Sequence, residues 1–138
     1  MRDGKAGDGR NRLQGRRIAL VEDETLVALL LQDVLEDQGC TVLGPATSLR
    51  QALDLASIEP PPDAAVMDLN LNGELSWPAV ERLSSRGVPV VIVSGYSGLD
   101  RERERMAAVV LTKPVLPERL VEALARFFPD VATTASAP

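Results

Sequence analysis

Five short, mostly apolar runs recur along the chain, and each has the length of a buried strand. They are residues 17–21, 40–43, 64–67, 88–93 and 107–111. None of them shows the regular alternation of apolar and polar positions that marks a strand with one face in water. Strands that are apolar throughout need cover on both faces, which is typical of a parallel sheet between two layers of helices.

Helical patterns fill the intervals between these runs. Residues 25–38 place leucines and valines on one broad face and acidic or amide side chains on the other. Ser48 and Ser76 are positioned to cap two further helices, and residues 117–128 form a last amphipathic one. Residues 100–105 are charged on all sides and predict only a short or irregular fourth helix. Strand and helix thus alternate five times, which predicts an α/β fold, a doubly wound (βα)5 sandwich with a five-stranded parallel sheet of order 2-1-3-4-5.

Composition narrows the functions that this fold can serve. The chain has no histidine, which excludes His-ligated metals, Ser–His or Cys–His catalysis and a phosphohistidine carrier. Its single cysteine, Cys40, stands at the start of the apolar run 40–43 and indicates a buried thiol in a reducing cytoplasm. No apolar run is long enough to span a bilayer, so we expect no membrane segment.

Charge divides the chain into three parts. Residues 1–16 carry a net charge of +3 within a polar, Gly-rich stretch and predict a disordered basic leader. Residues 17–128 are expected to form the folded domain, and residues 129–138 a disordered tail. The chain beyond the leader carries −8, which argues against a nucleic-acid-binding surface.

Polar side chains stand where four of the predicted strands end. Glu22 and Asp23 follow the first strand, Asp68 the third, Ser94 the fourth and Lys113 the fifth. The carboxyl ends of parallel strands share one edge of the sheet, where ligands bind. Three carboxylates that meet there repel one another, so at least one pKa should rise. A magnesium ion would relieve this repulsion, and an ammonium and a hydroxyl beside it suit phosphoryl transfer onto Asp68.

Lys113 is the only lysine after Lys5, whereas the rest of the domain uses arginine. A compact ammonium suits a narrow pocket that a planar guanidinium does not, so a specific role is favoured over a chance surface lysine. The proline that follows it fits a tight turn and a cis Lys113–Pro114 bond.

The residues at these strand ends resemble the receiver domain of bacterial two-component response regulators, which has a flavodoxin-like fold. The resemblance covers roughly residues 16–128 and rests on Val-Glu-Asp-Glu at 21–24, Met-Asp-Leu-Asn at 67–70, Val-Ser-Gly at 93–95 and Thr-Lys-Pro at 112–114. It implies that Asp68 is phosphorylated and that Mg²⁺ is held by Glu22, Asp23, Asp68 and the backbone carbonyl of Asn70. It also implies that Ser94 and Lys113 contact the phosphoryl group and couple it to a conformational change.

Two features depart from the usual receiver pattern. Receivers place a Tyr or Phe switch residue three positions before the lysine, where this chain has Val110. Ile-Val-Ser-Gly-Tyr at 92–96 partly matches the Phe-Ala-Thr-Gly-Tyr motif of a subgroup of mostly stand-alone receivers that also lack that aromatic. We hypothesise that Tyr96, or the segment that follows it, carries the signal; the alternative is a loop aromatic without such a role.

The resemblance implies a cytoplasmic, single-domain regulator, not an enzyme with a separate substrate. A histidine kinase or phosphotransfer protein would donate the phosphoryl group, and the domain would assist its own phosphorylation and dephosphorylation. It would act on an unknown downstream protein by contact, or serve as a phosphate sink. A docking module independent of phosphorylation and a small aspartyl-phosphate phosphatase remain as alternatives; Asn70 stands where such a phosphatase has its second acid.

Overall fold

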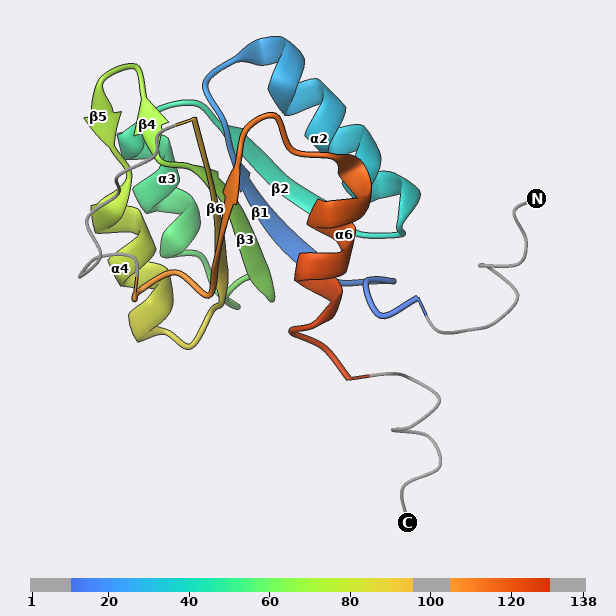
Figure 1. Cartoon of the computed structure of the whole chain (residues 1–138). Coiled ribbons are helices and arrows are strands. Elements are labelled where there is room, and N and C mark those ends of the chain that lie inside the picture. The colour runs from blue at the N-terminus through green and yellow to red at the C-terminus, as the bar shows by residue number, and fades with distance from the viewer. Residues whose placement is uncertain (1–10, 96–104, 130–138) are drawn as a thin grey trace.

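The computed structural model describes residues 11–95 and 105–129 and contains the predicted parallel sheet (Figure 1). Five strands lie in the order β2-β1-β3-β6-β7, which is the order 2-1-3-4-5 expected for the five apolar runs. Each neighbouring pair is parallel, so all five strands end at the same rim of the sheet. The strands are β1 (Arg17–Val21), β2 (Thr41–Ala46), β3 (Ala64–Asp68), β6 (Val90–Ser94) and β7 (Val109–Thr112).

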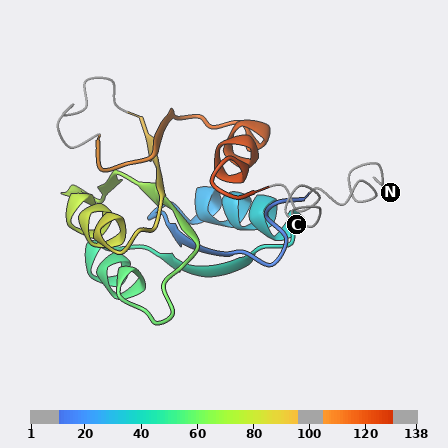
Figure 2. The same cartoon turned by 90° about the horizontal axis from the view of Figure 1, so that it is seen from below.

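Helices cover both faces of the sheet, which confirms the doubly wound α/β fold (Figure 2). Within the described residues, α2 (Thr25–Asp37) and α6 (Pro117–Ala125) pack on one face, and α3 (Leu49–Ala56) and α4 (Trp77–Ser85) pack on the other. The predicted helix at 100–105 falls almost wholly on residues 96–104, outside the described residues. No helix in the described part of the chain is both long and apolar enough to cross a membrane.

The starts of α3 and α4 differ in how their serines are used. Ser48 caps α3 as predicted, because its hydroxyl accepts a hydrogen bond from Gln51 N at 3.1 Å. Ser76 occupies the cap position of α4, but its buried hydroxyl donates to the carbonyl of Asp68 at 2.9 Å instead of capping the helix. The predicted cap position of Ser76 is therefore confirmed but without a side-chain cap bond, and the hydroxyl ties the start of α4 to the end of β3.

Strand β2 is longer than the apolar run 40–43 predicted, because it continues through Gly44 and Pro45 to Ala46. Proline is tolerated there because β2 is an edge strand and needs no backbone donor on its outer side. Gly44 has a φ of 106°, and a Cβ at this position would lie 2.7 Å from the carbonyl oxygen of Leu20. Only glycine fits this bend, so the Gly-Pro pair bends the strand instead of ending it.

Helix α2 buries less of its apolar face than its sequence pattern suggested. Only Ala28, Leu31 and Leu35 are buried, whereas Leu26 and Leu30 are 81% and 56% exposed. The sheet and α6 together cover a narrow strip of this helix, and the leucines beside that strip face solvent. We call the exposed leucines Leu26, Leu29 and Leu30 the leucine face of α2.

The described residues before β1 pack onto the domain, although the sequence suggested a disordered leader up to residue 16. Leu13 is 1% exposed and belongs to the core beneath α2 and α6. The Asn11 side chain donates to the carbonyl of Gln38 at 2.7 Å, and the Arg16 guanidinium lies 4.3 Å from the centre of the Phe128 ring. One leucine in a polar stretch gives no periodic signal, which is why the sequence placed this boundary later. Residues 1–10 and 130–138 lie outside the described residues.

Candidate functional site

The ends of four strands bring the charged residues singled out from the sequence into one pocket. Glu22 and Asp23 follow β1, Asp68 ends β3, Ser94 ends β6 and Lys113 follows β7. The loops that carry them lie along the upper edge of the sheet in Figure 1. The pocket has a volume of about 360 Å³, and its lining residues are Asp23, Glu24, Asp68, Asn70, Asn72, Ser94, Gly95 and Lys113. We call Glu22, Asp23, Asp68 and Lys113 the acidic pocket.

Lys113 is the cation at the centre of this pocket. Its Nζ donates to Asp68 Oδ2 at 2.8 Å and lies 3.4 Å from Glu22 Oε1 and from Glu24 Oε1. Partial burial alone would lower the pKa of Lys113, but the hydrogen bond to Asp68 and the charges of Asp68 and Glu22 raise it above its ordinary value. The ammonium therefore stays charged and partly neutralises the carboxylates. The Lys113–Pro114 peptide bond is cis, as expected from the sequence.

Glu22 is the most deeply buried acid of the pocket, at 1% exposure. Its Oε2 accepts a hydrogen bond from Glu24 N at 3.0 Å, whereas its buried Oε1 has no hydrogen-bond partner among the described residues. Burial raises the pKa of Glu22 from its ordinary value of 4.5 to about 7, and the negative charge of Asp68 adds to this rise. One carboxyl of the pocket thus has a raised pKa, as the sequence predicted, but burial and not repulsion between carboxylates is the main cause.

The donor set of this pocket fits a hard divalent cation. Glu22, Asp23 and Asp68 each offer one carboxylate oxygen, and these three oxygens lie within 4.8 Å of one another. A buried carboxylate oxygen without a hydrogen bond is costly, and a cation would supply the missing partner. Carboxylate oxygens with room for water and phosphate oxygens suit Mg²⁺ better than metals that prefer sulfur or imidazole.

The other residues that the sequence singled out differ in how they lie relative to the acidic pocket. Asn70 lines the pocket, and its backbone N–H donates to Asp68 Oδ1 at 3.1 Å. Ser94 is buried, its carbonyl accepts a hydrogen bond from Lys113 N at 2.8 Å, and both residues line the pocket. Val110 packs, partly buried, against the core beneath α3 and α4. Tyr96 lies outside the described residues, so its suggested switching role stays a prediction.

Three contacts in this region were not visible from the sequence. The Glu24 carboxylate contacts Lys113. The backbone N–H of Asn72 donates to Asp23 Oδ2 at 3.0 Å, and the Ser76 hydroxyl donates to the carbonyl of Asp68. The last two join a backbone group to a distant residue, and a sequence pattern carries no signal for such contacts. The Asn-Gly pair at 72–73 was the available hint, because it is typical of a hairpin turn.

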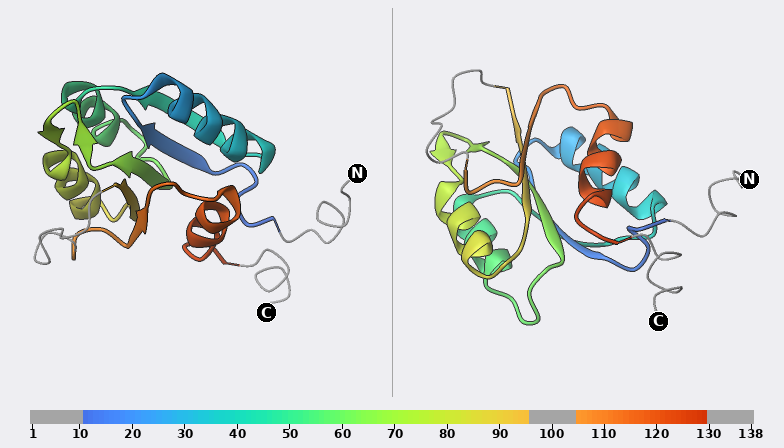
Figure 3. Two further views of the ribbon diagram at one scale, coloured as in Figure 1. Left: turned by 45° about the horizontal axis from the view of Figure 1, so that its top comes forward. Right: turned by 60° about the horizontal axis from the view of Figure 1, so that its bottom comes forward.

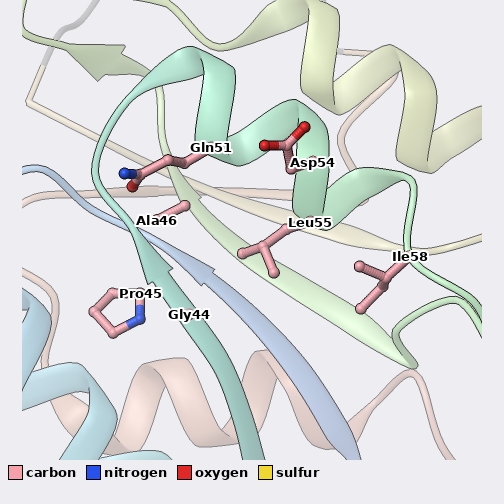
Figure 4. A pocket seen from close by; sticks show the side chains of 7 residues that line it. All are labelled: Gly44, Pro45, Ala46, Gln51, Asp54, Leu55 and Ile58. Atoms are coloured by element: carbon pink, nitrogen blue, oxygen red, sulfur yellow. The ribbon is translucent and has the colours of Figure 1, made fainter.

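A second hollow, of about 450 Å³, lies between the end of β2 and α3 (Figure 4). Its lining is mainly apolar and backbone, including Pro45, Leu55 and Ile58, and Asp54 is the only charged residue among the lining residues. It lacks the convergent charges of the acidic pocket, so the pocket at the strand ends is the candidate functional site.

Comparison with known proteins agrees with this geometry. Residues 18–125 match the family described as the response regulator receiver domain. The transcriptional regulatory protein PdtaR of Mycobacterium tuberculosis is 28% identical over 113 residues, which are 79% of this chain and 55% of PdtaR. The chemotaxis protein CheY of Thermotoga maritima is 28% identical over 115 residues, which are 80% of this chain and 95% of CheY. The phyllosphere-induced regulator PhyR of Methylorubrum extorquens is 31% identical over 72% of this chain and 39% of PhyR.

Solved structures give the same picture of the fold. A CheY-like receiver domain from Methylobacillus flagellatus has a TM-score of 0.71 at 26% identity, over 83% of this chain and 99% of that one. A CheY-like receiver domain from Methanospirillum hungatei has a TM-score of 0.71 at 24% identity, over 82% of this chain and 93% of that one, and this likeness concerns the fold alone. The chain spans about half the length of PdtaR. Because the family match covers most of the sequence and includes every residue of the acidic pocket, the chain belongs to the response regulator receiver domain family.

Proposed function

We propose that this domain is a phosphorylation-dependent signalling switch in which Asp68 accepts the phosphoryl group. The observation that carries this proposal is the direct contact of Asp68 Oδ2 with Lys113 Nζ, in a pocket where Glu22 and Asp23 supply two further carboxylates. A carboxylate that is paired with a fixed cation and lies in an open pocket can act as a nucleophile, because its charge is held in place without blocking access. The donor is a histidine kinase or a phosphotransfer protein.

The transfer needs little covalent chemistry from the protein. A carboxylate oxygen of Asp68 attacks the phosphorus of the donor phosphohistidine, the new P–O bond forms, and the P–N bond breaks with its electron pair leaving on the histidine nitrogen. Lys113 stabilises the negative charge on the phosphoryl oxygens, and Ser94 is the adjacent hydroxyl that can hydrogen-bond to them. The same groups would face a water molecule during later hydrolysis, so we propose that the domain assists both steps.

Magnesium belongs to this proposal because the pocket has more negative charge than Lys113 can balance. Glu22, Asp23 and Asp68 would hold the ion, and Asn70, which lines the same pocket, would add its backbone carbonyl as a ligand. When bound, the ion neutralises carboxylate charge and draws phosphoryl oxygens toward Asp68. Phosphorylation would replace the single negative charge of the Asp68 carboxylate by the charge of about −1.5 to −2 that a phosphoryl group carries, a net gain of roughly half to one negative charge. The phosphoryl oxygens would compete with Glu22 and Glu24 for contact with Lys113. This competition would alter the contacts around the pocket.

A protein donor needs a surface beside the pocket on which to dock. The leucine face of α2 starts two residues after Glu24, whose carboxylate contacts Lys113. Exposed apolar side chains next to a reactive site are typical of protein interaction surfaces. We therefore propose that the donor and the downstream protein are recognised by contact, with the leucine face as part of the donor surface.

Treatment with acetyl phosphate and Mg²⁺, followed by mass spectrometry, tests the phosphorylation site. We expect one added phosphoryl group on the wild-type chain and none on Asp68→Asn, because the amide is not a nucleophile. Asp54→Asn, in the hollow beside α3, is the matched control and should label like the wild type.

Each alternative to this function has its own outcome. Labelling of Asp68→Asn at the wild-type level would show that another residue accepts the group and would overturn the proposal. No labelling of the wild type at saturating Mg²⁺ would favour a docking module that is independent of phosphorylation. Sustained turnover of a simple phosphate ester would favour a phosphatase.

A further inference from the structure

A small hairpin that the sequence analysis did not predict follows Asp68. Its strands are β4 (Asn70–Leu71) and β5 (Glu74–Leu75), which pair antiparallel around an Asn-Gly turn. Figures 1 and 3 show it at the rim of the sheet, next to α4 and on the side where the strands end. We call residues 70–75 the rim hairpin.

The base of the rim hairpin is fixed to Asp68 from both sides. Its first strand begins at Asn70, whose N–H donates to Asp68 Oδ1 at 3.1 Å. Its second strand is followed by Ser76, whose hydroxyl donates to the carbonyl of Asp68 at 2.9 Å. Leu71 is 2% exposed and belongs to the core beneath α3 and α4. The hairpin is therefore anchored to the backbone and the side chain of Asp68.

The tip of the rim hairpin reaches the other side of the pocket. Asn72 N–H donates to Asp23 Oδ2 at 3.0 Å, and Gly73 N–H donates to Asn70 Oδ1 at 2.6 Å. Asn72 has a φ of 53° and Gly73 a φ of 94°, so the turn depends on two residues in the left-handed region. This backbone shape aims the Asn72 N–H at Asp23, which comes from the loop after β1.

We propose that the rim hairpin is a positioning element that sets the affinity of the acidic pocket for its divalent cation, by holding the Asp23 carboxylate through the Asn72 N–H. The inference rests on the proposed metal-dependent function and assigns it a determinant in this chain. Lys113 contacts Glu22, Glu24 and Asp68, whereas Asp23 is held by a neutral amide. An amide fixes one carboxylate oxygen without cancelling its charge, so the other oxygen stays oriented for a cation.

Gly73→Ala tests this proposal because it changes only the turn. A Cβ at Gly73 would meet nothing within 4 Å, so the substitution acts through its backbone φ alone. Gly87→Ala is the matched control, because Gly87 also has a positive φ, of 78°, and open space for a Cβ. Gly87 lies between α4 and β6, at the opposite end of the sheet from the acidic pocket.

The readout is the dissociation constant for Mg²⁺, measured by calorimetry on the unphosphorylated chain. Alanine disfavours the left-handed conformation, so the turn in Gly73→Ala relaxes. Part of the free energy of Mg²⁺ binding is then used to restore the turn, which raises the dissociation constant roughly fivefold or more. Gly87→Ala should keep the wild-type dissociation constant for Mg²⁺, although it should lose about as much thermal stability as Gly73→Ala does. Gly73→Asn should restore most of the affinity, because asparagine tolerates positive φ.

A spectroscopic signature separates positioning from general loosening. The amide resonance of Asn72 should lie downfield in the wild type because its proton is shared with a carboxylate, and it should move upfield in Asp23→Asn and in Gly73→Ala but not in Gly87→Ala. Equal Mg²⁺ affinity in Gly73→Ala and the wild type would overturn the inference, as would an equal loss in both glycine variants. If the wild type binds no Mg²⁺, the proposed metal-dependent function is rejected. The Asn72 resonance then tests separately whether the rim hairpin holds Asp23.

Discussion

The variant Glu22→Gln removes a buried negative charge from the metal-free acidic pocket. It therefore measures how much that charge destabilises the fold. The buried Glu22 carboxyl has a pKa of about 7 in the folded chain and an ordinary value of 4.5. Between these values the folded state binds more protons than the unfolded state, so stability falls as pH rises through this window. Glutamine keeps the shape of the side chain and the oxygen that accepts from Glu24 N, but it carries no charge that burial can penalise.

The expected size of the effect follows from the shift in pKa. One pKa unit is worth about 1.4 kcal/mol, so the charged form of Glu22 destabilises the metal-free fold by roughly 3 kcal/mol once pH is well above the folded value. At about pH 5 most of the folded population is protonated at Glu22, and less than about 1 kcal/mol of this penalty remains. The stability advantage of Glu22→Gln should therefore grow by roughly 2 kcal/mol between about pH 5 and about pH 8.

Urea denaturation in the presence of EDTA at these two pH values measures this difference. Glu81→Gln, on the exposed side of α4, controls for the loss of one negative charge. Saturating Mg²⁺ should remove most of this advantage at about pH 8, because a ligand at about 100 times its dissociation constant adds about 2.7 kcal/mol to a fold that binds it. Only the wild type keeps all three carboxylates. An advantage of Glu22→Gln that stays constant or shrinks as pH rises would refute the assignment of the penalty to Glu22.

Three further predictions concern the core, the donor surface and the phosphoryl contact. Leu13→Ala should lower the free energy of unfolding by about 2–4 kcal/mol in urea denaturation, whereas Leu116→Ala, at a position 61% exposed, should change it little; equal effects would place Leu13 outside the core. The double variant Leu26→Ser, Leu30→Ser should slow phosphoryl transfer from a protein donor while leaving labelling by acetyl phosphate unchanged, and equal slowing of both would argue against docking on the leucine face. Lys113→Ala should slow labelling by acetyl phosphate about tenfold or more, because the cation beside the acceptor is lost; an unchanged rate would exclude that role.

The apolar runs along the chain were sufficient to predict the sheet. Runs that lack alternation require cover on both faces, and that requirement leaves few topologies for five strands joined by helices. The same reasoning predicts that Glu22, Asp68 and Lys113 lie at one rim, because the carboxyl ends of parallel strands meet at the same edge of the sheet. These conclusions depend only on the local periodicity of the sequence and on the general right-handedness of connections between parallel strands.

Other features depend on contacts between distant segments. Leu13 is a core residue only because it packs in one cluster with buried side chains from β1, α2 and α6, and nothing in its polar neighbourhood signals this. Leu26 and Leu30 fit the apolar pattern of α2 as well as Leu31 does. The sheet and α6 cover only the strip of α2 that includes Leu31, so Leu26 and Leu30 stay exposed.

The chemistry of the pocket divides in the same way. The sequence determined which charged groups meet, because residue type and strand order are local properties. Only the tertiary structure decided that Glu22 is the acid forced toward its neutral form, that Lys113 pairs most closely with Asp68, and that the rim hairpin holds Asp23. Burial and hydrogen bonding of a side chain depend on atoms contributed by other parts of the chain, so their balance is set only when the whole fold is in place.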